Sequence, residues 1–207
     1  MRLYNENLRS ALLDSAKEAF LKHGFAKAQL REIASAAGAT TGAVYKYFKD
    51  KEAIFDVLVC DAADRLMDDY KKAQTDFAEL DFSQKLPALT KIADNRQGSM
   101  IDTLYDNYDA FRLIACCSQG TKYEDYIDGL IQIEVDSSVA FLREMDKAGV
   151  PHRPIDKELI HIVASALFYG MFETLRHEMP RQKALVYMES LADFYSAGWF
   201  KILGLPS

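Results

Sequence analysis

The sequence predicts an all-α protein, with a small N-terminal helical domain followed by a larger helical domain. Three observations support this fold class. Apolar residues recur three and four positions apart along most of the chain, as on one face of a helix. We find no run of alternating β-branched residues, which would indicate a strand. The expected helix ends coincide with Gly, Pro, Ser or Asp, which cap or stop helices.

Three helices are expected in the first 50 residues. The first, over 5–23, is amphipathic and is ended by Gly24. The second begins after Gln29 and ends at Gly38, which can adopt the left-handed conformation of a helix stop. Thr40 is a good N-cap for the third helix, over 41–47. Two helices joined by a short turn with glycine form a helix-turn-helix, whose second helix enters the major groove of DNA.

The rest of the chain is also expected to be helical. Asp50 predicts the start of a long helix over 51–74, the only continuous link that we see between the two parts. Further helices are expected over 83–95, 99–107, 108–118, 124–148, 157–177 and from 180 to about 203. The sequence therefore predicts a DNA-binding domain over 1–50 and a second helical domain over 51–207.

The stretch from Gln29 to Phe55 resembles the TetR family of transcriptional regulators. The positions in register with the family pattern are Ile33, Ala34, Ala37, Gly38, Gly42, Tyr45, Tyr47, Phe48, Lys51, Glu52 and Phe55. Four positions depart from it, with Gln29 for Thr, Ala39 for Val, Thr40 for Ser and Ile54 for Leu. The resemblance covers about residues 5 to 55. It implies a regulator that binds DNA through its N-terminal domain.

The charge distribution agrees with this expectation. The 207-residue chain carries a net charge of -6, which by itself argues against nucleic acid. Residues 1–55, however, hold nine Lys or Arg and six Asp or Glu, so the acidic excess lies in the rest of the chain. A mildly basic N-terminal domain is expected where only that domain meets phosphate.

The candidate DNA contacts lie on and around the expected recognition helix. Thr41, Ala43 and Lys46 face away from the inward side of Val44, and by family resemblance Thr41 and Lys46, with Arg31 on the preceding helix, are the candidate base readers. Phosphate is the expected partner of a wider set, including main-chain N–H groups at the helix start: Thr40, Thr41, Gly42, Tyr45, Tyr47 and Lys51. The alternative for Tyr45 and Tyr47 is a half-buried packing role.

The second domain carries two further candidate surfaces. The last two helices are the most apolar, and small residues such as Ala166 and Gly170 would let helix backbones approach closely. The resemblance implies a homodimer through these helices; the alternative is that they only close the domain's own core. The resemblance also implies a small-molecule effector. We expect some of seven residues to line its pocket, and the alternative is that they are ordinary core or surface residues: Tyr105, Tyr108, Phe111, Arg112, Tyr126, Phe168 and Phe172.

Several other functions find no support in the sequence. We find no HExxH, P-loop or GxSxG motif, no metal-type spacing of Cys or His, and no run of about 20 apolar residues. The adjacent Cys116 and Cys117 are expected to be free thiols that pack as small hydrophobes. We therefore expect a cytoplasmic protein that is not an enzyme and that has no cofactor, no metal and no membrane partner.

The sequence thus predicts a homodimeric transcriptional regulator that binds a palindromic operator in double-stranded DNA. We expect a repressor that a small molecule releases from that operator. The alternative is a DNA-binding regulator without a small-molecule effector, controlled by a protein partner.

Overall fold

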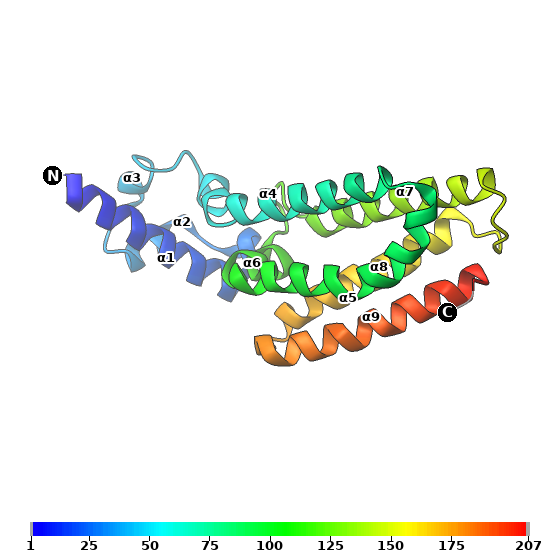
Figure 1. Ribbon diagram of the computed structural model, residues 1–207. Helices are drawn as coiled ribbons and strands as arrows, with labels where there is room; N and C mark the ends of the chain where they lie inside the picture. Colours follow the sequence, from blue (N-terminus) through cyan, green and yellow to red (C-terminus); the bar gives the residue numbers. More distant parts are fainter. Residues whose placement is uncertain (1, 206–207) are drawn as a thin grey trace. The chain divides into compact units, whose positions relative to one another are not determined.

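The computed structural model describes the backbone of residues 2–205 and the side chains of residues 6–88 and 100–205. This part of the chain is helical throughout and has no strand, which confirms the all-α prediction. The helices, shown in Figure 1, are α1 (Arg2–Lys27), α2 (Leu30–Ala36), α3 (Thr41–Val44), α4 (Lys51–Ala78), α5 (Phe82–Asp106), α6 (Tyr108–Cys117), α7 (Tyr126–Lys147), α8 (Lys157–Arg176) and α9 (Arg181–Leu203).

The chain forms two compact units. Unit 1 contains the residues up to 65 together with 107–126, and unit 2 contains 66–106 together with the residues from 127 onward. The long helix α4 begins in unit 1 and ends in unit 2. Helix α6, from the middle of the sequence, belongs to unit 1 with the helix-turn-helix. The functional boundary after residue 50 stays a prediction.

An aromatic core holds unit 1 together. The rings of Phe20 from α1, Phe25 after its kink and Phe55 from α4 are all buried, with centroids 5.4 to 5.6 Å apart. Helices α2 and α3 pack onto this core through Ile33 and Val44, which are also buried. The short helix-turn-helix therefore gains its stability from packing rather than from helix propensity, because helices of four and seven residues are unstable alone.

The predicted caps are confirmed where local hydrogen bonds decide them. The Ala43 amide donates to Thr40 Oγ1 at 3.3 Å, and the Ala53 amide donates to Asp50 Oδ1 at 2.7 Å. The start of α8 is capped in the same way, since the Leu159 amide donates to Asp156 Oδ1 at 2.9 Å. Gln29 makes no side-chain cap hydrogen bond at the start of α2.

Some expected helix limits were wrong. The two helices expected over 83–95 and 99–107 are a single helix, α5, because an internal Ser or Gly costs a helix only about 1 kcal/mol or less relative to Ala. Helix α3 ends at Val44 rather than at residue 47, and α4 continues to Ala78. Gly24 interrupts α1 with φ of 74°, as expected, but helical structure resumes to Lys27.

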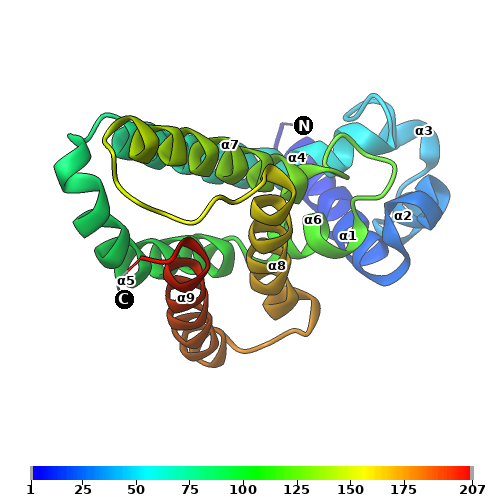
Figure 2. The ribbon, with the colours of Figure 1, turned by 90° about the vertical axis from the view of Figure 1, so that its right-hand side faces the viewer.

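Unit 2 is built from the second part of α4 together with α5, α7, α8 and α9. Helix α9 packs against α5, and α8 lies beside α9 in both views (Figures 1 and 2). Among the described residues, α8 is the one helix that is long and apolar enough to cross a bilayer by length and composition alone. The sequence contains no apolar run of about 20 residues, so a membrane-spanning helix is not expected from it. Ile160, Phe168 and Phe172 of α8 are buried in the protein, which is typical of a core helix.

Buried polar side chains link the helices of unit 2. Gln74 of α4 donates to Tyr70 Oη and to Glu134 Oε2 of α7, Tyr70 donates to the same carboxylate, and Ser137 donates to Gln74 Oε1. Lys85 of α5 is 2% exposed, and its Nζ lies 2.5 Å from Glu144 Oε2. Because each group has partners, the network fixes the register of α4 against α7.

Candidate DNA-binding surface

Helices α2 and α3 present a mostly polar outer surface because their largest fully buried apolar residues face the core. Ile33 and Ala34 of α2 and Val44 of α3 are buried in the core of unit 1. The left-handed Gly38, with φ of 66°, turns the chain between the two helices, where a residue with a Cβ would be strained. The residues on the opposite sides of α2 and α3, two helices that Figure 1 labels, are exposed or half-buried.

Eight of the nine predicted DNA contacts lie on or beside this outer side. Arg31, Thr40, Gly42, Tyr45 and Lys46 are exposed, and the other three are half-buried: Thr41, Ala43 and Tyr47. Tyr45 is 59% exposed, which does not fit the packing alternative considered for it. Tyr47 places its ring 6.5 Å from the ring of Phe48, so it also supports the core. Their contacts with DNA stay predictions.

Lys51, the ninth candidate, points into the protein. Its Nζ donates to the main-chain oxygens of Phe25 at 2.6 Å, Ala28 at 3.0 Å and Ala26 at 3.4 Å. The ammonium also lies 4.4 Å from the centre of the Phe25 ring. Burial lowers the pKa of Lys51 from its usual value.

Sequence reasoning missed one exposed cation near the helix-turn-helix. Arg9 of α1 places its guanidinium 5.5 Å from the centre of the Phe48 ring, just after α3. Phe48 is buried, so this stacking fixes Arg9 against the surface. Arg9 and Phe48 are 39 positions apart and no periodic pattern joins them, so this contact could not be predicted from local sequence.

The segment after α6 holds the first turns of α4, within unit 1. Tyr123 Oη donates to Asp56 Oδ1 at 2.5 Å, and Lys122 Nζ lies 2.6 Å from the same oxygen. Hydrogen bonds from Lys122 and Tyr123 lower the pKa of Asp56, while burial and the bond to Asp56 raise the pKa of Tyr123. Tyr126 Oη donates to the main-chain oxygen of Ala63 at 2.7 Å. These contacts hold one face of the first turns of α4 against the segment after α6.

Comparisons with known proteins agree with this geometry. Residues 12–58 match the family model described as bacterial regulatory proteins, tetR family. The helix-turn-helix segment of this chain therefore belongs to the TetR family. The match covers α2, α3 and the first turns of α4, and so includes the surface described above.

A curated relative supports the same assignment. A segment of 58 residues is 34% identical to the HTH-type transcriptional repressor Rv1474c of Mycobacterium tuberculosis. It covers 28% of this chain and 31% of the relative, so the chain spans about a third of that relative's length. The relatives are named as transcriptional repressors or regulators, which is a non-enzymatic role.

Solved structures extend the likeness of fold to the whole chain. NalD, the secondary repressor of the MexAB-OprM efflux pump in Pseudomonas aeruginosa, is 21% identical with a TM-score of 0.56, over 96% of both chains. FadR of Bacillus subtilis, solved in complex with stearoyl-CoA, is 17% identical with a TM-score of 0.52, over 91% of this chain and 98% of its own. Beyond the family-matched segment, the helices of this chain thus share the fold of these two proteins.

The seven residues predicted to line an effector site are divided between the two units of the chain. Phe111 is buried with its ring 6.4 Å from that of Tyr126, while Phe168 lies 5.5 Å from the ring of Tyr70. Tyr105 Oη donates to the main-chain oxygen of Met179 at 2.8 Å. Unit 1 holds Tyr108, Phe111, Arg112 and Tyr126, and unit 2 holds Tyr105, Phe168 and Phe172. Their role in ligand binding stays a prediction.

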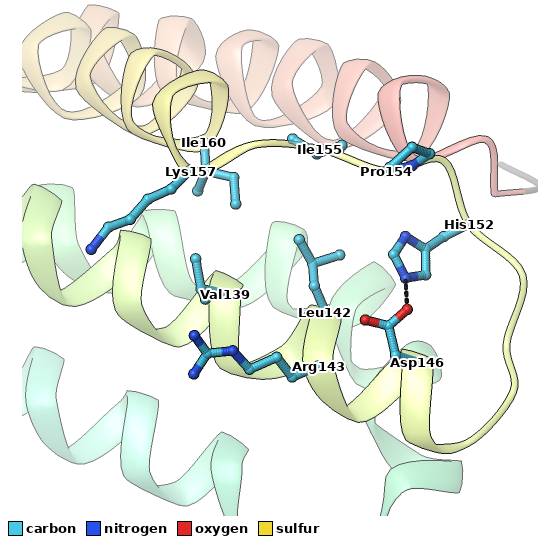
Figure 3. A pocket seen from close by; sticks show the side chains of 9 residues that line it. All are labelled: Val139, Leu142, Arg143, Asp146, His152, Pro154, Ile155, Lys157 and Ile160. Atoms are coloured by element: carbon cyan, nitrogen blue, oxygen red, sulfur yellow. Dashed lines mark hydrogen bonds and ion pairs between the residues drawn. The ribbon is translucent and has the colours of Figure 1, made fainter.

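A cavity of about 280 Å³ lies in unit 2 between α7 and the segment that leads into α8 (Figure 3). None of the seven predicted residues lines it. Its apolar wall includes Leu142 and Ile160, and at one side His152 Nε2 lies 3.1 Å from Asp146 Oδ1. Pockets for drug-sized ligands usually measure about 300–1,000 Å³, so this cavity is slightly smaller than that range.

The three cysteines are free thiols. Cys117 is buried, and burial raises its pKa to about 11, so its thiol is protonated at neutral pH. This agrees with the expected role as a small hydrophobe. Cys116 is exposed, so the same expectation was wrong for it; its side chain points about 100° away from that of Cys117 around α6 and lies outside the buried face.

Proposed function

We propose that this protein is a sequence-specific transcriptional repressor that binds a palindromic DNA operator as a homodimer in the cytoplasm. A small-molecule effector bound by its C-terminal helices releases it from the operator. The proposal rests most directly on the outer side of α2 and α3, where Arg31, Tyr45 and Lys46 are exposed inside the family-matched segment.

These residue types suit the two tasks of a DNA-binding surface. Arg31 and Lys46 can donate to guanine edges or to phosphate, and Ala43 offers a methyl group for contact with thymine. The hydroxyl of Tyr45 can donate to a phosphate oxygen because the side chain projects from the protein. The buried Val44 and the Thr40 cap fix the orientation from which these side chains reach out.

A homodimer is supported by the outer sides of α8 and α9. These helices expose large apolar side chains, with Phe194 69% and Ile162 63% exposed, and also Leu159, Val186 and Tyr187. Such a group of apolar residues on the surface of one molecule is typical of an interaction site. A two-fold partner would place two recognition helices about 34–36 Å apart, one turn of DNA.

The effector is supported by the fold alone. FadR of Bacillus subtilis, a protein of this fold, was solved with stearoyl-CoA, so the fold can hold an organic ligand. In this chain we propose that some of the seven predicted residues line the ligand site. An effector that changes operator affinity 5- to 150-fold needs a coupling of only about 1–3 kcal/mol between the two sites.

Selection of binding sites from random duplexes tests the DNA-binding part. The expected result is enrichment of a palindrome, with an affinity that falls steeply as salt rises. Lys46→Ala should relax the preference for the enriched sequence, whereas the control Lys147→Ala, at the exposed end of α7, should not change it. A purified dimer with no preference among duplexes contradicts the proposal.

A separate measurement tests the effector. The wild-type protein bound to a fluorescent copy of the selected operator is screened against metabolites and acyl-CoA thioesters, and release is followed by anisotropy. Release by one compound class, with a matching rise in the unfolding temperature of the free protein, supports the proposal. Release only by a protein from cell extract would favour the alternative of control by a protein partner.

A further inference from the structure

Lys51 forms an unusual set of contacts for a residue in a DNA-binding motif. Its Nζ lies 2.6, 3.4 and 3.0 Å from the main-chain oxygens of Phe25, Ala26 and Ala28, respectively. An ammonium group has three N–H donors and no acceptor. The three carbonyls therefore use every hydrogen bond that this side chain can donate.

The position of these carbonyls explains why an ammonium is held there. They lie where α1 ends, after the left-handed Gly24, and the last carbonyls of a helix have no partners within it. The end of a helix also carries partial negative charge, which a cation stabilises. The ring of Phe25, 4.4 Å from Nζ, adds a second favourable surface for the charge.

The start of α4 provides the opposite environment. Lys51 is the first residue of this 28-residue helix, where the partial positive charge of the helix disfavours a cation. Because the Lys51 side chain extends to the end of α1, its ammonium group lies away from the start of α4. Phosphate contact would instead require Lys51 to give up its three carbonyl bonds and its contact with Phe25.

The carbonyls that Lys51 binds precede α2 directly. Gln29, the residue between them and α2, makes no side-chain cap hydrogen bond, so the start of α2 lacks the usual local support. Ala28 is buried and Phe25 nearly so, which places this turn against the core below the helix-turn-helix. The hydrogen bonds of Lys51, from 23 to 26 positions later in the chain, hold the turn before α2 where a local N-cap hydrogen bond is missing.

We propose that Lys51 is a positioning residue, which ties the end of α1 to the start of α4 and so fixes α2 for DNA binding, and that it does not anchor phosphate. This inference rests on the proposed function, because it concerns how the helix-turn-helix is oriented for an operator. It reassigns one residue of the motif from the DNA surface to the frame behind it.

The salt dependence of operator binding separates the two roles. Each phosphate contact that is lost lowers the slope of log K against log salt by about 0.9. Lys46→Met, on the exposed side of the motif, should show this fall. Lys51→Met should keep the wild-type slope and weaken binding at every salt concentration by roughly 10- to 150-fold, the effect of losing a charged hydrogen bond. Lys51→Arg, which keeps the charge and the donors, should restore most of the affinity.

Amide hydrogen exchange of the protein without DNA gives a second measurement. Lys51→Met should speed exchange in residues 25–30, whereas Lys46→Met should leave it unchanged. If the wild-type protein binds no operator, the proposed function fails. Hydrogen exchange still tests whether Lys51, at the start of α4, stabilises the end of α1 through its hydrogen bonds.

The contrary result is equally distinct. A folded Lys51→Met protein that loses as much salt slope as Lys46→Met, with unchanged exchange in residues 25–30, overturns the proposal. Should Lys51→Met lose its helical circular dichroism while Lys46→Met keeps it, the result supports the proposal, because a residue that only anchors phosphate is dispensable for folding.

Discussion

Gly170 offers a substitution whose effects on the protomer and on the dimer should have opposite signs. It lies inside α8 with helical neighbours on both sides, and among the described residues a Cβ at this position would meet no atom within 4 Å beyond the adjacent backbone of α8. Gly170→Ala should therefore stabilise each protomer by about 1 kcal/mol, the difference in helix propensity. No described residue of the protomer requires a glycine there, whereas close approach by a helix of the second copy in the proposed dimer would require one.

The expected cost to the dimer follows from overpacking. Added methyl groups in a close-packed contact usually cost about 1–3 kcal/mol. The dimer dissociation constant should thus rise roughly 5- to 150-fold. Sedimentation equilibrium measures this constant, and urea unfolding at protein concentrations well below it measures the protomer.

Gly129→Ala is the matched control. Gly129 lies in α7 of the same unit, and a Cβ there meets Met67 Cε at an ordinary 3.5 Å. This variant should stabilise the protomer to a similar extent and leave dimerisation unchanged. A Gly170→Ala protein that dimerises as tightly as wild type would refute the placement of Gly170 at the contact between copies.

Three further predictions follow from hydrogen bonds and exposure. Asp50→Ala should lower stability by about 1 kcal/mol, seen in thermal unfolding, because the cap on the Ala53 amide is lost, and Asp50→Ser should recover most of it. Folding lowers the pKa of Asp56 below its usual value of 3.8, so the ionised carboxylate stabilises the folded protein above about pH 5, and this stabilisation is lost as the pH falls through the folded pKa. Asp56→Asn should therefore flatten the acid side of the curve of unfolding free energy against pH. An unchanged curve would contradict this expectation. Phe194→Ser should weaken the dimer and leave the unfolding of the dilute protomer nearly unchanged, because the ring is 69% exposed; a large loss of protomer stability would show instead that the ring packs internally.

The features that sequence predicted well are governed by neighbouring residues. The caps at Thr40, Asp50 and Asp156 are hydrogen bonds over three residues, so residue type and position were enough to identify them. The buried face of α2 follows from the spacing of Ile33 and Ala34. The outer side of α2 and α3 could be predicted as the complement of that buried face.

Features that depend on distant residues could not be predicted in this way. The break expected near residue 96 does not occur, because an unfavourable local propensity of at most about 1 kcal/mol does not end a helix. Tyr126 was expected to line a ligand site, and its hydroxyl donates to Ala63 O in α4, 63 positions earlier. No periodicity of the sequence encodes such a pairing.

The sequence by itself determined the all-α class, the helix-turn-helix and the residues on its outer side, because helical periodicity and capping act over a few positions. The tertiary structure decided that α6 joins the same unit as the helix-turn-helix and that Lys51 turns away from the expected DNA surface. The reason is physical: an ammonium goes where unpaired carbonyls and an aromatic ring meet, and only folding brings the end of α1 to the start of α4.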